Sequence, residues 1–115
     1  MHQNFRFSRI SNEIYKILAK LLHDTTRNYW LLHVVITDVE VSKDLKYANV
    51  FFYSSDKQLD KENILKALNH SLGFFRTHLA KKMSLHTVPR LNFFYDSSID
   101  YGEKIDNLIQ KTLEI

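Results

Sequence analysis

The sequence predicts an α+β fold in which helices pack on one face of a three-stranded sheet. Apolar residues recur at helical spacing in several segments, and short stretches rich in β-branched and aromatic residues lie between them. The resulting order is α-β-β-α-α-β, followed by a short C-terminal helix. The chain has 115 residues with only 2 glycines and 1 proline. It therefore fits one domain, residues 1–115, built from long regular elements.

The first predicted elements are a helix and a β-hairpin. Residues 8–23 carry one apolar stripe, and Ser8 or Ser11 can cap its start. Residues 32–42 are rich in β-branched residues and alternate in their second half. One side of that half presents Thr37, Val39 and Val41. Residues 46–54 alternate in the same way, and the short polar link between the two segments predicts an antiparallel hairpin.

The middle of the chain predicts a helix pair. Asp60 is a capping candidate, and apolar residues recur at helical spacing until Gly73 interrupts the pattern and the spacing resumes. Two interpretations compete, one helix with a tolerated glycine or two helices that meet at a kink. Glycine costs about 1 kcal/mol relative to alanine inside a helix, so the pattern favours the kink.

The last predicted elements are a strand and a short helix. Pro89 ends the preceding helix, and residues 91–95 are apolar and aromatic, which predicts the third strand. Ser97 or Ser98 can then cap a final helix. The aromatic residues of the second and third strands could stack on bases, but on a sheet covered by helices alternate rings belong more often to the core.

Charge and composition narrow the class of function. The net charge is +3, but residues 63–95 contain no carboxylate at all. Such a basic segment suits a polyanion, since phosphates repel carboxylates and favour Lys and Arg; a solvated basic face with no partner is the alternative. The chain has no cysteine, which excludes thiol chemistry and fits a reducing cytoplasm. No apolar run is long enough to predict a membrane span.

The sequence contains no set of residues that would support enzyme chemistry. Two glycines cannot build a nucleotide-binding glycine loop, and no pair of histidines has metal-ligand spacing. Asp38 and Glu40 share a strand face that we expect to be solvated. The sequence therefore predicts no catalytic residue, no metal and no cofactor.

The element order with a kinked helix pair is that of type II KH domains. These domains bind single-stranded RNA at a Gly-x-x-Gly turn between the paired helices. Residues 69–73 take the place of that turn here and lack its first glycine.

One branch of this fold is similar to the chain over residues 6–110. The matching segments are Val35–Leu45 (VITDVEVSKDL), Ala67–Arg76 (ALNHSLGFFR), Thr87–Phe93 (TVPRLNF) and Tyr95–Ser98 (YDSS), with Arg6 and Arg9 before them and Gly102 and Ile105 after them. They resemble the ribosome-binding factor A family, which replaces the glycine turn with a helix kink of the form Ala-x-Gly. Ser71 stands where that family usually has alanine, and residues 24–32 differ from its usual short link.

The resemblance implies a cytoplasmic, monomeric protein that binds the free small ribosomal subunit during late assembly. It would assist maturation of the 5′ region of small-subunit ribosomal RNA and have a role in cold adaptation. Its partners would be that RNA and, in addition, neighbouring ribosomal proteins.

The candidate RNA-binding residues lie in or beside the helix pair. They are Lys66, Asn69, His70, Ser71, Gly73, Arg76, Lys81 and Lys82. Lys and Arg would neutralise phosphates, the small residues at the kink would allow close backbone approach, and Asn69 and His70 would reach a base or a 2′-hydroxyl. Secondary candidates are Arg6, Arg9, Lys43, Lys46 and Arg90. For each basic residue alone, a solvated surface charge is the alternative.

Two other functions remain open. A free-standing KH-type binder of messenger or small RNA would crosslink selectively to such RNA. A protein–protein adaptor of the same fold would bind with little dependence on salt.

Overall fold

The computed structural model describes residues 5–24, 28–83 and 88–98, and the side chains of this part from residue 9 onward. The elements are α1 (Phe5–Asp24), a 3-10 helix η1 (Tyr29–Leu31), β1 (Val34–Val41), β2 (Tyr47–Ser54), α2 (Lys61–His70), α3 (Leu72–Lys82) and β3 (Arg90–Tyr95). This order confirms the predicted α+β arrangement. The predicted C-terminal helix lies outside the described residues.

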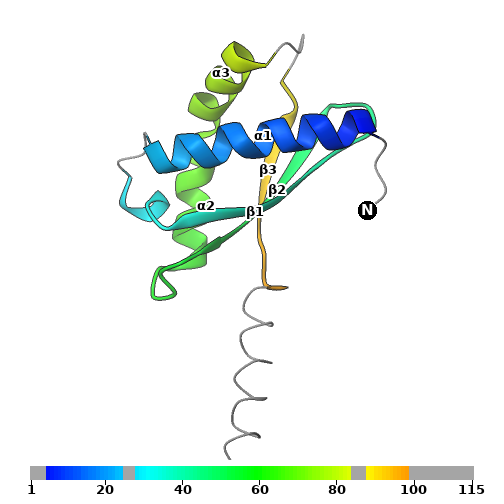
Figure 1. Ribbon diagram of the computed structural model, residues 1–115. Coiled ribbons are helices and arrows are strands. Elements are labelled where there is room, and N and C mark those ends of the chain that lie inside the picture. Colours follow the sequence, from blue (N-terminus) through cyan, green and yellow to red (C-terminus); the bar gives the residue numbers. More distant parts are fainter. Residues whose placement is uncertain (1–4, 25–27, 84–87, 99–115) are drawn as a thin grey trace, which may run out of the picture.

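The three strands form one mixed sheet in the order β1-β2-β3. β1 and β2 are antiparallel, which confirms the predicted hairpin. β3 returns parallel to β2, and the connection between these strands is the helix pair α2–α3. Figure 1 shows α1 crossing the strands, with α2 and α3 following each other along one side of the molecule.

A β-bulge in β1 explains why that strand does not alternate along its whole length. Ile36 pairs with Phe52 and Asp38 pairs with Phe51, so Thr37 is an extra residue without a partner in the register. The bulge changes the phase of the strand and puts both Ile36 and Val39 on the buried face. The prediction that Thr37 shares a face with the inward valines was therefore wrong.

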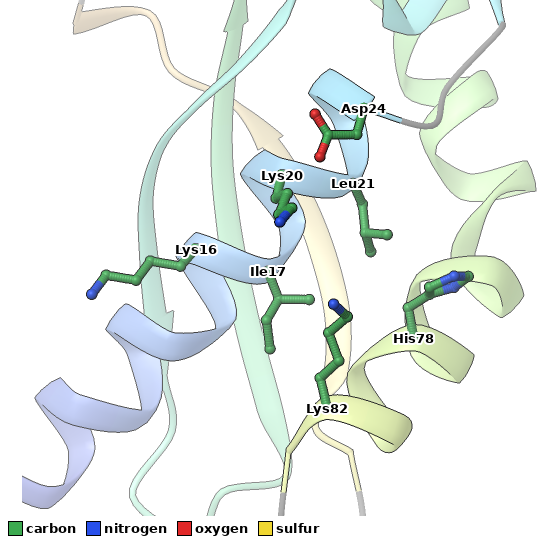
Figure 2. A pocket seen from close by; sticks show the side chains of 7 residues that line it. All are labelled: Lys16, Ile17, Lys20, Leu21, Asp24, His78 and Lys82. Carbon is green, nitrogen blue, oxygen red and sulfur yellow. The ribbon is translucent and has the colours of Figure 1, made fainter.

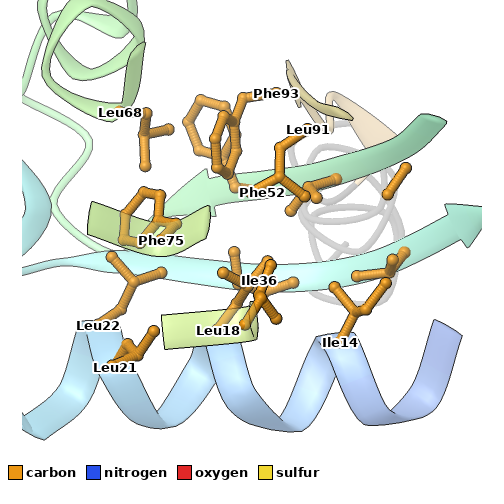
Figure 3. Close-up of a cluster of buried hydrophobic side chains, with 14 of the residues drawn as sticks. Ile14, Leu18, Leu21, Leu22, Ile36, Phe52, Leu68, Phe75, Leu91 and Phe93 are labelled. Atoms are coloured by element: carbon orange, nitrogen blue, oxygen red, sulfur yellow. The ribbon is translucent and has the colours of Figure 1, made fainter. Parts of the chain in front are cut away.

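One hydrophobic core joins the helices to a single face of the sheet. Ile14 and Leu18 of α1, Ile64 and Leu68 of α2, Leu79 of α3 and Val50 and Phe52 of β2 are all fully buried. Figure 3 shows Leu18, Phe75 and Phe93, from three different elements, inside the same cluster. Burying each large apolar side chain contributes about 1.5–3 kcal/mol to the stability of the fold. The apolar stripes therefore determine which side of each helix packs on the sheet.

The helix starts are only partly as predicted. Asp60 caps α2, and its carboxylate accepts a hydrogen bond from the Glu62 N–H at 3.3 Å. Ser11, in contrast, is buried inside α1, and this helix already includes Phe5. Neither Ser8 nor Ser11 is therefore the first cap, because the apolar stripe that we used to place the start begins later than the helix itself.

Candidate nucleic-acid interface

The helix pair breaks at Ser71, and its backbone hydrogen bonds are kept across the break. The Ser71 backbone has φ −93° and ψ 5°, outside the helical region. Its N–H donates to the carbonyl oxygens of Ala67 and Leu68, and its own carbonyl oxygen accepts from the Phe75 N–H at 3.0 Å. The Ser71 side chain does not cap α3. The kink interpretation is thus confirmed, and the hydroxyl is not used to hold it.

Gly73 lies two residues beyond the break, which corrects its predicted role as the interruption. It is exposed and is the second residue of α3, and a Cβ built on it would meet no atom within 4 Å beyond its chain neighbours and the backbone of its own helix. Neither the backbone nor the packing of this chain therefore requires glycine there. Because Gly73 has no side chain, the surface of the kink is open to close approach by a partner.

Three predicted residues of α2 lie together on its solvent side. Lys66, Asn69 and His70 all lie outside the buried core, whereas Ile64 and Leu68 point into it. Residues three and four apart are neighbours on a helix surface, so Lys66 reaches the side of the helix that leads to the kink. We call Lys66, Asn69, His70, Ser71, Gly73 and Arg76 the kink surface.

The predicted residues of α3 do not form one patch. Arg76 and Lys82 are about 120° apart around the helix axis, and the buried Leu79 lies between them in sequence. Lys81 and Lys82 end α3, roughly 12–14 Å along the axis from Gly73 at 1.5 Å per residue. The structure therefore separates these two lysines from the kink surface, and only Arg76 stays beside it.

The four predicted basic side chains of these helices carry no carboxylate partner among the residues that the structure describes. In the part of the chain that the structure describes, no ion pair involves Lys66, Arg76, Lys81 or Lys82. Lys66, Arg76, Lys81 and Lys82 are all exposed. Their charges are therefore available to phosphate groups, and binding need not first break an ion pair.

The secondary candidates gather at the other end of the sheet. Lys43 and Lys46 are exposed in the β1–β2 turn, and the Arg90 N–H donates to the Lys46 carbonyl oxygen at 2.7 Å. Arg9 is exposed on α1, and Arg6 belongs to the same helix, but its side chain lies outside the described residues. These residues are thus not part of the kink surface.

The turn that carries the two hairpin lysines is held by Asp44. Its carboxylate accepts from the Ser42 hydroxyl at 2.7 Å and from the Lys46 N–H at 3.0 Å. These hydrogen bonds, led by that of Ser42, lower the pKa of Asp44 below its ordinary value. Leu45 adopts a φ of 62°, a left-handed conformation in which such a side chain costs about 1–2 kcal/mol.

The aromatic residues divide between the two faces of the sheet. Phe52 and Phe93 are core residues, as the core interpretation predicted. Phe51 and Phe94 stack at 5.6 Å on the face that no described helix covers, and Phe94 is 45% exposed. The Asn92 amide donates to the Asn49 carbonyl oxygen at 3.4 Å on this same face.

Sequence reasoning missed a groove between α1 and α3. Its lining residues are Lys16, Ile17, Lys20, Leu21 and Asp24 of α1 and His78 and Lys82 of α3. Figure 2 shows the Lys82 side chain reaching toward Ile17 and Leu21 from the opposite helix. The four-residue spacing of Lys16, Lys20 and Asp24 was visible in the sequence, but the packing of α1 against α3 was not.

The described residues hold no group of three or more His, Cys, Asp or Glu side chains that could bind a metal ion. Among the same residues, no helix is both long enough and apolar enough to cross a membrane.

The fold and this surface define a class of protein, a small α+β domain with a three-stranded mixed sheet, a broken helix pair and basic side chains beside the break. The sequence model of the family described as Ribosome-binding factor A matches residues 6–109. The chain belongs to this family, as the resemblance indicated. The family consists of ribosome assembly factors without enzymatic activity, which confirms that the chain is not an enzyme.

Known proteins agree with this assignment over most of the chain. Ribosome-binding factor A of Francisella philomiragia is 41% identical over 109 residues, which are 95% of this chain and 76% of that protein. The crystal structure of ribosome-binding factor A from Thermus thermophilus matches with a TM-score of 0.71 at 20% identity, covering 77% of this chain and 93% of that chain.

A second Thermus thermophilus structure shares the fold. It is a homology model of ribosome-binding factor A fitted into a cryo-EM map of a 30S complex of that protein. It matches with a TM-score of 0.63 at 21% identity, covering 76% of this chain and 91% of that chain.

Proposed function

We propose that this protein binds the free small ribosomal subunit and assists the late maturation of its ribosomal RNA, including processing at the 5′ end. Membership of the ribosome-binding factor A family over residues 6–109 carries this proposal. The protein acts as a single domain of residues 1–115, as a monomer in the cytoplasm, and has a role in cold adaptation. Neighbouring ribosomal proteins are further partners.

The kink surface is the proposed centre of the RNA contact. Ser71 and Gly73 let the backbone come close to RNA, because the small Ser71 side chain does not cap α3 and Gly73 carries no side chain. Asn69 and His70 end α2 beside the break and are exposed, so they are the residues that reach a base edge or a 2′-hydroxyl. Lys66 and Arg76 stand on either side of the break and bind phosphates.

Lys81 and Lys82 form a second phosphate contact at the far end of α3. Contacts to phosphate position a protein on RNA but carry no sequence information. Specificity therefore comes from the shape of the RNA, which must present phosphates to both ends of the α2–α3 pair.

Co-sedimentation with ribosomal particles tests the proposed function. The purified protein is sedimented with free small subunits, free large subunits and whole ribosomes over a range of salt concentrations. We expect binding to free small subunits alone, and affinity that falls steeply as salt rises. Equal binding to all particles, or to none, would contradict the proposal, and selective crosslinking to messenger or small RNA would favour the KH-type alternative.

Reversing the charges at the end of α3 tests the second contact. The double variant Lys81→Glu, Lys82→Glu should weaken binding to the small subunit and flatten its salt dependence, because two phosphate contacts are lost. Both side chains are exposed, so the urea unfolding midpoint should stay unchanged. Lys57→Glu, an exposed reversal in the loop before α2, is the matched control. Unchanged affinity in the double variant would remove these lysines from the interface.

A further inference from the structure

The groove between α1 and α3 has the size and composition of a small ligand site. Its volume is about 300 Å³, at the lower end of the range for ligand pockets. The floor is apolar, since it is formed by Ile17 and Leu21 of the core cluster. Helical spacing builds it from neighbours four residues apart on each helix, Ile17 with Leu21 and His78 with Lys82.

The rim of the groove is strongly basic. Lys16 and Lys20 follow one another along α1, and Lys82 approaches from α3 (Figure 2). Asp24 is the one carboxylate among the lining residues that the structure describes. A ligand with a negative charge at the lysine end and an apolar part over the floor therefore complements this lining.

His78 adds an aromatic edge beside this floor. The Nδ1–H of its ring donates to the Phe74 carbonyl oxygen at 3.0 Å, which fixes the ring and leaves Nε2 unused by that bond. The Phe74 ring lies 4.3 Å from the His78 ring and is 44% exposed. Aromatic surface next to lysines is the combination that holds unstacked bases of RNA.

We propose that this groove binds one unpaired nucleotide of small-subunit ribosomal RNA. Its phosphate lies between Lys20 and Lys82, its base rests on Ile17 and Leu21 against His78, and Asp24 accepts a hydrogen bond from a ribose hydroxyl or an exocyclic amino group. The inference rests on the proposed function and adds α1 to the interface. Lys82 then serves as the link between the α2–α3 pair and the groove.

Titration with mononucleotides tests the groove apart from the ribosome. The full chain, labelled with carbon-13 in its methyl groups, is titrated separately with uridine 5′-monophosphate, uridine and ribose 5-phosphate, and NMR follows Ile17 and Leu21. We expect the mononucleotide to shift these methyl signals more strongly than either fragment does. The variant Lys20→Gln, Lys82→Gln should weaken binding about tenfold, whereas Lys57→Gln, at an exposed position outside the groove, should not.

Two outcomes of the titration overturn the inference. Methyl signals that do not move would show that no base enters the groove. Equal shifts with ribose 5-phosphate and with the mononucleotide would show binding of an anion alone.

Site-directed crosslinking separates this inference from the proposed function. Since the chain has no cysteine, Lys16→Cys can carry an azidophenacyl group at the α1 rim of the groove, with Lys57→Cys as the control. We expect Lys16→Cys, but not the control, to crosslink to RNA in the small subunit. A protein that co-sediments without this crosslink overturns the groove and leaves the proposed function standing. A protein that does not co-sediment overturns the proposed function, and the groove then depends on the titration.

Discussion

Two adjacent phenylalanines of β3 show how one residue step changes the role of a ring. Phe93 is 8% exposed and its ring lies 5.8 Å from that of Phe75, whereas Phe94 is 45% exposed on the open face. Phe93→Ala should lower the free energy of unfolding by about 3–5 kcal/mol. Phe94→Ala should cost only about 1 kcal/mol, mostly the lost stacking on Phe51. Urea unfolding of both variants measures this, and equal losses would contradict the assignment of the two faces.

The bulge residue Thr37 fixes the carboxylate that follows β3. Its hydroxyl donates to Asp96 at 2.6 Å, and the Ser98 hydroxyl and N–H donate to the other oxygen of Asp96. These donors, first Ser98 and then Thr37, lower the pKa of Asp96 below its ordinary value of 3.8. The stabilisation is therefore fully present above that ordinary value and is lost as the pH falls through the lowered pKa.

Thr37→Val tests this arrangement, because valine keeps the shape and removes the donor. At neutral pH the variant should lose about 1 kcal/mol of stability. The pKa of Asp96, followed by NMR, should rise toward its ordinary value, and the stability difference should shrink in acid. Ser42→Ala, which removes a donor to Asp44 in the hairpin turn, is a control that should leave the pKa of Asp96 unchanged. An unchanged pKa of Asp96 in Thr37→Val would contradict the prediction.

At the scale of the helix pair, a substitution at Gly73 should change stability and RNA binding in opposite directions. Alanine is favoured over glycine inside a helix by about 0.5–1 kcal/mol, and a Cβ at this site meets no atom within 4 Å beyond its chain neighbours and the backbone of its own helix. Gly73→Ala should therefore stabilise the protein. If RNA approaches the kink closely, the same variant should bind the small subunit several-fold more weakly.

Ser71→Ala is the companion variant, since the Ser71 side chain forms no cap on α3. It should leave stability nearly unchanged, so any loss of binding measures a contact of its hydroxyl. Binding that stays unchanged in both variants would mean that the kink serves the fold alone.

The elements that could be predicted from the sequence are those with a clear apolar period. The apolar stripes predicted α1 and the helix pair, and the alternating pattern predicted β2. Together these patterns also predicted much of the core. The bulge could not be predicted, since an extra residue in β1 shows only against its partner strand. The break at Ser71 was assigned to Gly73 because propensity points to glycine, whereas the backbone turns two residues earlier.

The sequence predicted which segment of the chain contains the candidate site, but not which of its residues share one surface. The sequence showed that the middle of the chain is basic, but not that Arg76 and Lys82 stand on different sides of α3. It gave no sign that Lys16 and Lys20, far earlier in the chain, lie across from Lys82. The packing of α1 on α3 brings these lysines to opposite sides of one groove, and no local sequence pattern predicts that packing.

At the scale of the whole molecule, the candidate RNA-binding side chains that the structure describes on the helix pair, in the groove and at the hairpin occupy two regions that the fold holds apart. The kink surface and the α1–α3 groove lie on the helical side, while Lys43, Lys46 and Arg90 lie at the hairpin end of the sheet. An RNA that binds one of these regions can therefore leave the other region uncontacted. We therefore expect the helical region to carry the affinity for the small subunit.

Two exposed arginines, one from each region, allow a matched test. Arg76 belongs to the kink surface, and Arg90 pairs with Tyr47 at the start of β3. Arg76→Gln should weaken subunit binding and reduce the slope of log affinity against log salt by about 1, as expected when one phosphate contact is lost. Arg90→Gln should change neither. Equal changes in slope would show that the RNA also reaches the hairpin end, because a side chain that contacts no phosphate releases no counterion when the complex forms.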